Sequence, residues 1–150
     1  MNKELMFSSK EEKWQTPDDV FNKLNGEFNF TLDPCCQHDS AKCGKYYTPV
    51  ENGLLQSWEG ETVFVNPPYG RSLKTWVRKC HNEATKDNTI VVMLIPSRTD
   101  TSYFHDYIYN KSEVRFLRGR IKFVNPVTKK QKDSAPFPSM IVIFNNKGEI

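Results

Sequence analysis

The chain has 150 residues, with 21 Lys and Arg against 18 Asp and Glu and a formal net charge of +3. This length favours one domain with room for a core, and a hydrophobic content of 37% excludes a disordered chain. No stretch approaches the roughly 20 apolar residues of a membrane-spanning helix, and no signal peptide is readable after Met1. We therefore expect a cytoplasmic protein whose four cysteines stay reduced.

The charge is distributed unevenly along the chain. Residues 1–61 carry 6 basic and 11 acidic side chains, whereas residues 62–150 carry 15 basic and 7 acidic ones. The segment 111–132 holds eight Lys or Arg residues and one acidic residue, Glu113. Such a cluster suits a polyanionic partner, and a solvated basic surface has the same composition.

A polar N-terminal segment precedes the first predicted helix. Residues 1–13 are expected to be flexible, so that a single folded domain spans 14–150. The helix is predicted to begin with Thr16 as its N-cap and Pro17 at the first helical position, because both residue types suit those positions. Gly26 is expected to end the helix.

Strands and helices alternate along the rest of the chain. Short runs of β-branched and aromatic residues predict the strands, and apolar residues three or four positions apart predict the helices. Strands are predicted at 28–32, 46–47, 62–65, 89–95, 114–117, 121–124 and 140–144, and helices or helical turns at 39–43, 72–85 and 100–109. This alternation predicts an α/β fold whose sheet is mostly parallel with an antiparallel end.

The most informative motif is Asn66-Pro67-Pro68-Tyr69, directly after a predicted strand. Ligands of open α/β sheets bind at the carboxyl ends of strands, and Asp33 lies at the end of an earlier one. The Asn66 oxygen and the Pro67 carbonyl can accept the two N–H bonds of a planar amine, while the Tyr69 ring offers a stacking face. This arrangement would stabilise the positive charge that develops when the amine attacks an electrophile. The alternative is a strand that simply ends at two prolines.

The motif resembles the catalytic motif of S-adenosylmethionine-dependent amino-methyltransferases, and the whole chain is similar to the small phage-type (Dam-like) DNA N6-adenine methyltransferases. The resembling segments are Trp14-Gln15-Thr16-Pro17, Phe30-Thr31-Leu32-Asp33-Pro34-Cys35, Ala41-Lys42-Cys43, Tyr46-Tyr47-Thr48, Asn52-Gly53-Leu54, Trp58, Val65-Asn66-Pro67-Pro68-Tyr69, Leu94-Ile95-Pro96 and 116–123. The resemblance implies a minimal Rossmann-like methyltransferase sheet with S-adenosylmethionine as cofactor. It also implies direct attack by the N6 amine of a flipped-out adenine in double-stranded DNA, without a covalent enzyme intermediate.

The resemblance also implies the roles of individual residues. The catalytic motif is Asn66, Pro67, Pro68 and Tyr69, and the cofactor contacts fall on Thr16, Pro17, Asp33, Pro34, Cys35, Asn52, Leu54 and Asn66. We expect Arg118, Arg120, Lys122, Lys129, Lys130 and Lys132 to bind DNA phosphates.

Two features depart from the family pattern. No glycine-rich loop follows Asp33, because the next glycine is Gly44. Asp39 and Glu51 are both candidates for the acidic residue that would bind the cofactor ribose, and the sequence does not decide between them. No metal site is predicted, since the cysteines lack the paired spacing of a zinc site.

Two other functions stay open at the level of the sequence. A glutamine N5 methyltransferase acting on protein would also present an amide nitrogen to the motif, although the basic C-terminal half favours DNA. A catalytically inactive DNA-binding module with the same fold is the second alternative. The sequence specifies neither the target site nor whether the protein is a monomer or a dimer. A phage or prophage gene, as in restriction-modification, would place it in the bacterial cytoplasm.

Overall fold

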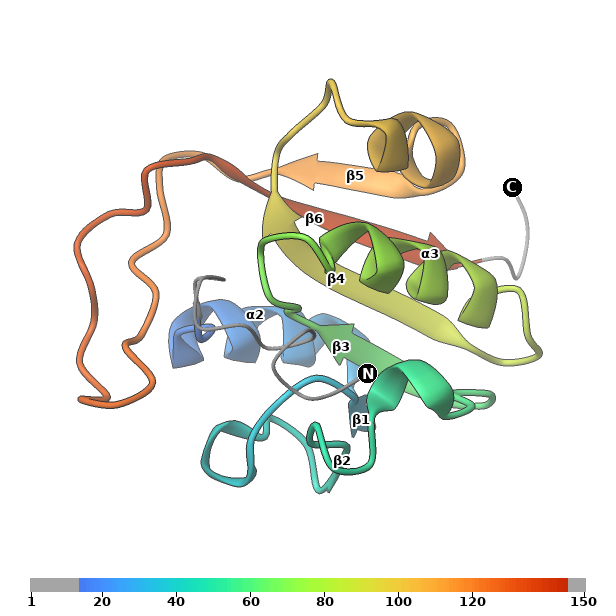
Figure 1. Cartoon of the computed structure of the whole chain (residues 1–150), viewed down its shortest axis with the longest axis horizontal. Coiled ribbons are helices and arrows are strands. Elements are labelled where there is room, and N and C mark those ends of the chain that lie inside the picture. The colour runs from blue at the N-terminus through green and yellow to red at the C-terminus, as the bar shows by residue number, and fades with distance from the viewer. Residues whose placement is uncertain (1–13, 146–150) are drawn as a thin grey trace.

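The strands form one six-stranded sheet in the order β2-β1-β3-β4-β6-β5 (Figure 1). The computed structural model describes residues 14–145, so the segment 1–13, predicted to be flexible, lies outside the described residues. The strands of the described part are β1 Leu32–Asp33, β2 Lys45–Tyr46, β3 Thr62–Val65, β4 Ile90–Pro96, β5 Glu113–Phe116 and β6 Ser139–Asn145.

The strand directions define the topology of the sheet. β1 pairs in parallel with β2 and with β3, and β3 pairs in parallel with β4. β6 runs antiparallel between β4 and β5. The predicted Rossmann-like α/β fold, mostly parallel with an antiparallel end, is therefore confirmed. The chain leaves β1 for the edge strand β2 and returns on the other side of β1 to form β3, so the loops after β1 and β3 diverge and leave a crevice.

Helices cover both faces of this sheet. α3 spans Leu73–Glu83 and packs on β4. Its buried apolar residues, at helical spacing, are Leu73, Trp76, Val77 and Cys80. α2 spans Asp18–Phe28 and lies on the opposite face, where Phe21 contacts Phe64 edge-on with ring centroids 5.2 Å apart (Figure 1). β4 and β6 are buried over nearly their whole length, as is typical of central strands between two helical layers.

The two ends of α2 differ from the prediction. Pro17, not Thr16, occupies the N-cap position, and no side chain caps the first turn, because the Thr16 hydroxyl is engaged in a tertiary hydrogen bond. Gly26 lies inside the helix, which Asn29 ends with a left-handed φ of 57°. The strand predicted over 28–32 is consequently wrong for residues 28–31, and the observed strand β1, Leu32–Asp33, overlaps it only at Leu32.

The strand predicted over 121–124 is wrong. These residues lie in the loop between β5 and β6, where Val124 forms isolated antiparallel bridges with Gln15 and Gln131 instead of joining the sheet. β3 has the predicted bounds, and α3, β4, β5 and β6 lie within two residues of theirs.

Three short helical segments complete the described fold. They are η1 His38–Ser40, η2 Gly53–Leu55 and η3 Phe104–Ile108, and η3 is a π-helical turn within the predicted helix 100–109. No helix in residues 14–145 is long and apolar enough to cross a membrane.

Candidate active site

A pocket lies where the loops after β1 and β3 diverge. The pocket is open to solvent on one side. Several residues assigned to the site from the sequence line it: Thr16, Asp33, Cys35, Asn66, Pro67 and Pro68. The strand order thus brings together residues that follow two different strands, as expected at the switch point of a doubly wound sheet.

The Asn66 amide is held on both of its sides. Its Nδ2 donates to the backbone carbonyl of Trp14 and to Thr16 Oγ1, the latter at 3.0 Å. A carbonyl oxygen only accepts, so the amide atom beside Trp14 must be the nitrogen, which settles the orientation of the side chain. Asn66 Oδ1 accepts from the Tyr69 hydroxyl at 2.6 Å, which leaves a lone pair of this oxygen for an external donor.

Tyr69 is buried, with 6% of its surface exposed. Its ring meets Phe123 and Phe137 edge-on, with centroids 6.1 and 5.7 Å away. Its hydroxyl lies 2.6 Å from Asn66 Oδ1 and 2.9 Å from the Leu94 carbonyl, so one proton is shared between two acceptors. Burial raises the pKa of this hydroxyl well above its usual range and keeps it a donor. The stacking role of the ring stays a prediction.

Asp33 is the buried acidic group of the pocket. Its Oδ1 accepts from the backbone N–H of Cys35 at 3.3 Å, and its Oδ2 from the backbone N–H of Lys42 at 3.0 Å. Burial raises the pKa of Asp33 to about 6, although the two backbone hydrogen bonds act in the opposite direction. A buried carboxylate is stabilised by a nearby cation, so Asp33 suits a ligand that brings positive charge into the pocket.

Some described residues assigned to the cofactor do not line this pocket: Pro17, Pro34, Asn52 and Leu54. The segment 52–54 packs against the loop that follows β1. A Cβ atom on Gly53 would lie 2.1 Å from the Pro34 carbonyl oxygen, and the Trp58 indole donates to the Gly53 carbonyl at 3.0 Å. This segment therefore contacts the loop whose residues line the pocket, without lining the pocket itself.

The two acidic residues considered for the ribose are engaged with the protein itself. Asp39 forms an ion pair with Lys129 at 2.9 Å. Glu51 accepts from the backbone N–H and the hydroxyl of Thr48 at 2.7 and 2.8 Å. Asp39 and Lys129 both line a second hollow, which shares Gln15, Thr16, Ser40 and Lys42 with the pocket.

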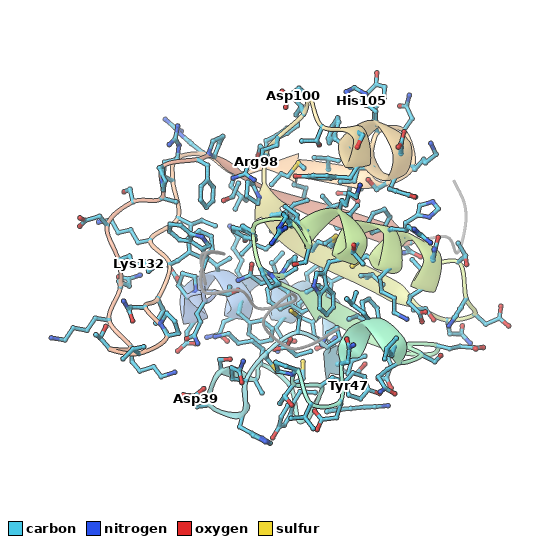
Figure 2. All side chains as sticks on the ribbon, viewed as in Figure 1. Asp39, Tyr47, Arg98, Asp100, His105 and Lys132 are labelled. Atoms are coloured by element: carbon cyan, nitrogen blue, oxygen red, sulfur yellow. The ribbon has the colours of Figure 1, made fainter. Side chains whose placement is uncertain are left out.

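The residues predicted to contact DNA lie on the loop 117–138, which extends from the sheet beside the carboxyl end of β4 (Figure 1). The exposed ones are Arg118, Arg120, Lys122, Lys129 and Lys130. Lys132 is half-buried, with its Nζ 4.2 Å from the centroid of the Trp14 ring. In Figure 2, Lys132 lies on this loop, and Asp39 lies toward the same side of the molecule.

The sequence did not assign several lining residues to the site: Trp14, Gln15, Cys36, Gln37, Ser40, Lys42, Phe64 and Pro126. A signal existed for Trp14, Gln15 and Lys42, since they belong to segments that carry the family resemblance. Pro126 comes from the loop between β5 and β6, and local sequence patterns give no sign of such a distant contact.

The cysteines are free thiols. Burial raises the pKa of Cys43 to about 12 and also raises that of Cys36, so both are protonated at neutral pH. Across residues 14–145, no three His, Cys, Asp or Glu side chains are grouped closely enough to hold a metal ion. These thiols therefore act as small, weakly polar side chains beside the pocket.

Comparison with known proteins identifies relatives along nearly the whole chain. Residues 4–150 match the family model described as DNA N-6-adenine-methyltransferase (Dam). The chain is 31% identical over 150 residues to the DNA N-6-adenine-methyltransferase of Haemophilus phage HP1 (strain HP1c1), covering 98% of this chain and 86% of that protein. It is 38% identical over 65 residues to YfdM of Escherichia coli (strain K12), which carries a provisional methyltransferase name, covering 39% of this chain and 71% of that protein.

A solved structure from Thermoplasma acidophilum, provisionally described as a methyltransferase, matches 89% of this chain with 12% identity and a TM-score of 0.37. This chain spans 56% of the length of that structure. The family model and the phage relative confirm the resemblance predicted from the motifs. The chain belongs to the DNA N-6-adenine-methyltransferase (Dam) family of adenine-specific DNA methyltransferases.

Proposed function

We propose that the protein transfers a methyl group from S-adenosylmethionine to the N6 amine of a flipped-out adenine in double-stranded DNA. The observation that carries this proposal is the state of the Asn66 amide at the end of β3. Its nitrogen is bound by Trp14 and Thr16, and its oxygen keeps a lone pair for one more donor. A side chain oriented in this way can accept an N–H bond without first rearranging, which is the basis of electrostatic preorganisation.

Asn66 and Pro67 act on the amine of the base. The Asn66 oxygen and the Pro67 carbonyl accept its two N–H bonds and so direct the nitrogen lone pair away from them. The lone pair forms the new N–C bond as the C–S bond of the donor breaks, and the cationic nitrogen then releases a proton. Both acceptors gain strength as positive charge develops on the nitrogen, so they stabilise the transition state more than the ground state.

Asp33 and Cys35 are the residues of this pocket that would hold the methyl donor. S-adenosylmethionine, when bound, supplies a methyl group made electrophilic by its sulfonium charge. The fit rests on Asp33, because its buried carboxylate has a raised pKa and gains from a cation.

DNA would reach the pocket from the side of the loop 117–138. Extruding a base from the duplex costs a few kcal/mol, which contacts to the flipped base and to phosphates offset. Arg118, Lys122 and Lys130 are exposed on this loop. Within the described residues, none of them forms a salt bridge. They suit phosphate contacts, which position the duplex without reading its sequence.

The test is methyl transfer from S-adenosylmethionine labelled on its methyl group. Purified protein is incubated separately with duplex DNA, with single-stranded DNA, with RNA and with cell protein, and the DNA is then sequenced by a method that detects N6-methyladenine. We expect label in duplex DNA, at adenines within one sequence context.

Label found mainly in RNA or in protein glutamine would overturn the assignment of the substrate. Cofactor binding measured by calorimetry separates the remaining case. A protein that binds DNA but neither binds nor consumes S-adenosylmethionine would be an inactive member of the family.

A further inference from the structure

We propose that Thr16 is a positioning residue for methyl transfer, acting through the Asn66 amide and not through contact with the methyl donor. The inference rests on the proposed function and deepens it. Thr16 precedes α2 and is 4% exposed, and its Oγ1 lies 3.0 Å from Asn66 Nδ2. The helix does not use the hydroxyl as an N-cap, although a threonine in front of Pro17 is suited to that role.

The contacts of the amide nitrogen define what Thr16 does. Asn66 Nδ2 carries two protons, and two acceptors face it, Thr16 Oγ1 and the Trp14 carbonyl. The amide therefore cannot rotate by half a turn, because its oxygen would then face the Trp14 carbonyl. Two N–H bonds donated by one amide also draw electron density toward its oxygen and strengthen that oxygen as an acceptor. Both effects bear on the oxygen that meets the amine.

The segment that carries Thr16 is anchored by contacts within the protein. Val124 donates its backbone N–H to the Gln15 carbonyl at 2.9 Å. The Trp14 ring contacts Phe123 and Phe137 edge-on, with centroids 5.4 and 5.1 Å away. The acceptors of the amide nitrogen are thus fixed by the loop 117–138, so Thr16 holds Asn66 through contacts that belong to the protein itself.

The experiment compares Thr16→Val with Thr16→Ser. Valine keeps the shape of threonine and removes the acceptor, whereas serine keeps the hydroxyl. We expect Thr16→Val to lower kcat about three- to tenfold, the rate equivalent of one net hydrogen bond. The Kd of S-adenosylmethionine should stay within about twofold of wild type, a shift too small to represent a lost hydrogen bond. Thr16→Ser should keep the wild-type kcat.

Thr85→Val is the matched control. Thr85 is exposed beyond the end of α3, and its hydroxyl donates to the Asn82 carbonyl at 2.7 Å. The same chemical change is made there, far from the pocket, and kcat should not move.

A second variant keeps the proposal testable if Thr16→Val does not fold. Asn66→Asp replaces the amide nitrogen by an oxygen that faces the Trp14 carbonyl. Only the protonated acid can donate to that carbonyl, so the pKa of the new carboxyl should rise. We expect the kcat of this variant, relative to wild type, to increase as the pH is lowered from about 8 to about 6, toward the range where a carboxyl with a raised pKa protonates.

Three results would overturn the inference. Thr16→Val could raise the Kd of the donor and leave kcat unchanged, which would make Thr16 a cofactor contact. It could behave as wild type in both respects. The relative kcat of Asn66→Asp could be flat across the pH range. A wild-type protein that methylates no DNA would instead refute the proposed function, so the two failures are distinguishable.

Discussion

The motif Asn66–Tyr69 and the basic loop 117–138 differ in how their polar side chains are held. Around Asn66 and Tyr69 each polar side-chain atom is bonded within the protein, and Tyr69 is 6% exposed. On the loop most cations point into solvent, and Lys129 has an exposed acidic partner in Asp39. Substitutions in the motif should therefore act on kcat, and substitutions in the loop should act on salt-dependent DNA affinity.

Asn66→Ala would test the motif most severely. We expect methyl transfer to fall by at least about 100-fold, the usual effect of removing one preorganised hydrogen-bonding group from a reaction centre. Binding of S-adenosylmethionine, measured by calorimetry, should persist because Asp33 and the other residues that line the pocket are untouched. Asn82→Ala, at the exposed end of α3, is the control and should keep full activity. Near-wild-type transfer by Asn66→Ala would refute the mechanism.

The next largest expected effect is the loss of S-adenosylmethionine affinity at low pH. The pKa of Asp33 is raised to about 6, so its carboxylate is ionised above that pH and protonated below it. If the donor binds only the ionised form, its affinity should fall about tenfold per pH unit below about pH 6. Calorimetry across that range measures this directly, and Asp33→Asn should remove the pH dependence together with most of the affinity.

The same group affects stability with the opposite sign. Because its pKa in the folded state is raised, Asp33 favours folding fully below pH 3.8, and this contribution is lost as the pH rises through about 6. At neutral pH the ionised carboxylate therefore lowers the stability of the unliganded protein, and a bound cation offsets this loss. An affinity that does not change between about pH 5 and about pH 7 would contradict the role given to Asp33.

Tyr69→Phe should have a smaller effect. It leaves the ring in place and removes the hydroxyl shared by Asn66 Oδ1 and the Leu94 carbonyl. We expect kcat to fall about three- to tenfold and the free energy of unfolding to fall by about 1 kcal/mol. Tyr109→Phe is the control, since Tyr109 is 55% exposed beside η3. An unchanged kcat would show that only the ring of Tyr69 matters.

Single lysines on the loop should have the smallest effects. Lys130→Gln removes one exposed charge, and if Lys130 contacts a phosphate the salt slope of DNA binding should decrease by about 0.9. Lys111→Gln is the control, because Lys111 is exposed and precedes β5, at the opposite end of that strand from the loop. Equal slopes for the two variants would mean that the loop does not form the DNA-binding surface.

Local sequence patterns predicted the elements whose stability is local or whose burial is complete. β3 has its predicted bounds, and β4 and β6 are recognisable because strands buried on both sides are apolar at every position. The motif Asn66–Tyr69 was found for the same reason, since it directly follows such a strand. The family resemblance then added residues that no periodicity would select.

Elements that depend on distant contacts were not predictable in this way. Thr16 has the sequence signature of an N-cap, but its hydroxyl accepts a hydrogen bond from Asn66, 50 positions away. Residues 121–124 have strand-like composition, but Val124 pairs with Gln15 and Gln131 outside the sheet. In both cases a tertiary partner outweighs local preference, and local patterns carry no information about that partner.

The close approach of Gly53 to Pro34 gives a steric reason for the glycine in the Asn52-Gly53-Leu54 segment. Even the smallest side chain at Gly53 would collide with the Pro34 carbonyl, so the chain must yield on one side or the other. If the loop after β1 shifted to make room, Cys35, which lines the pocket, would move with it. The Asn52-Gly53-Leu54 segment would then set the width of the pocket, and a substitution at Gly53 would alter ligand affinity without removing a contact to the ligand.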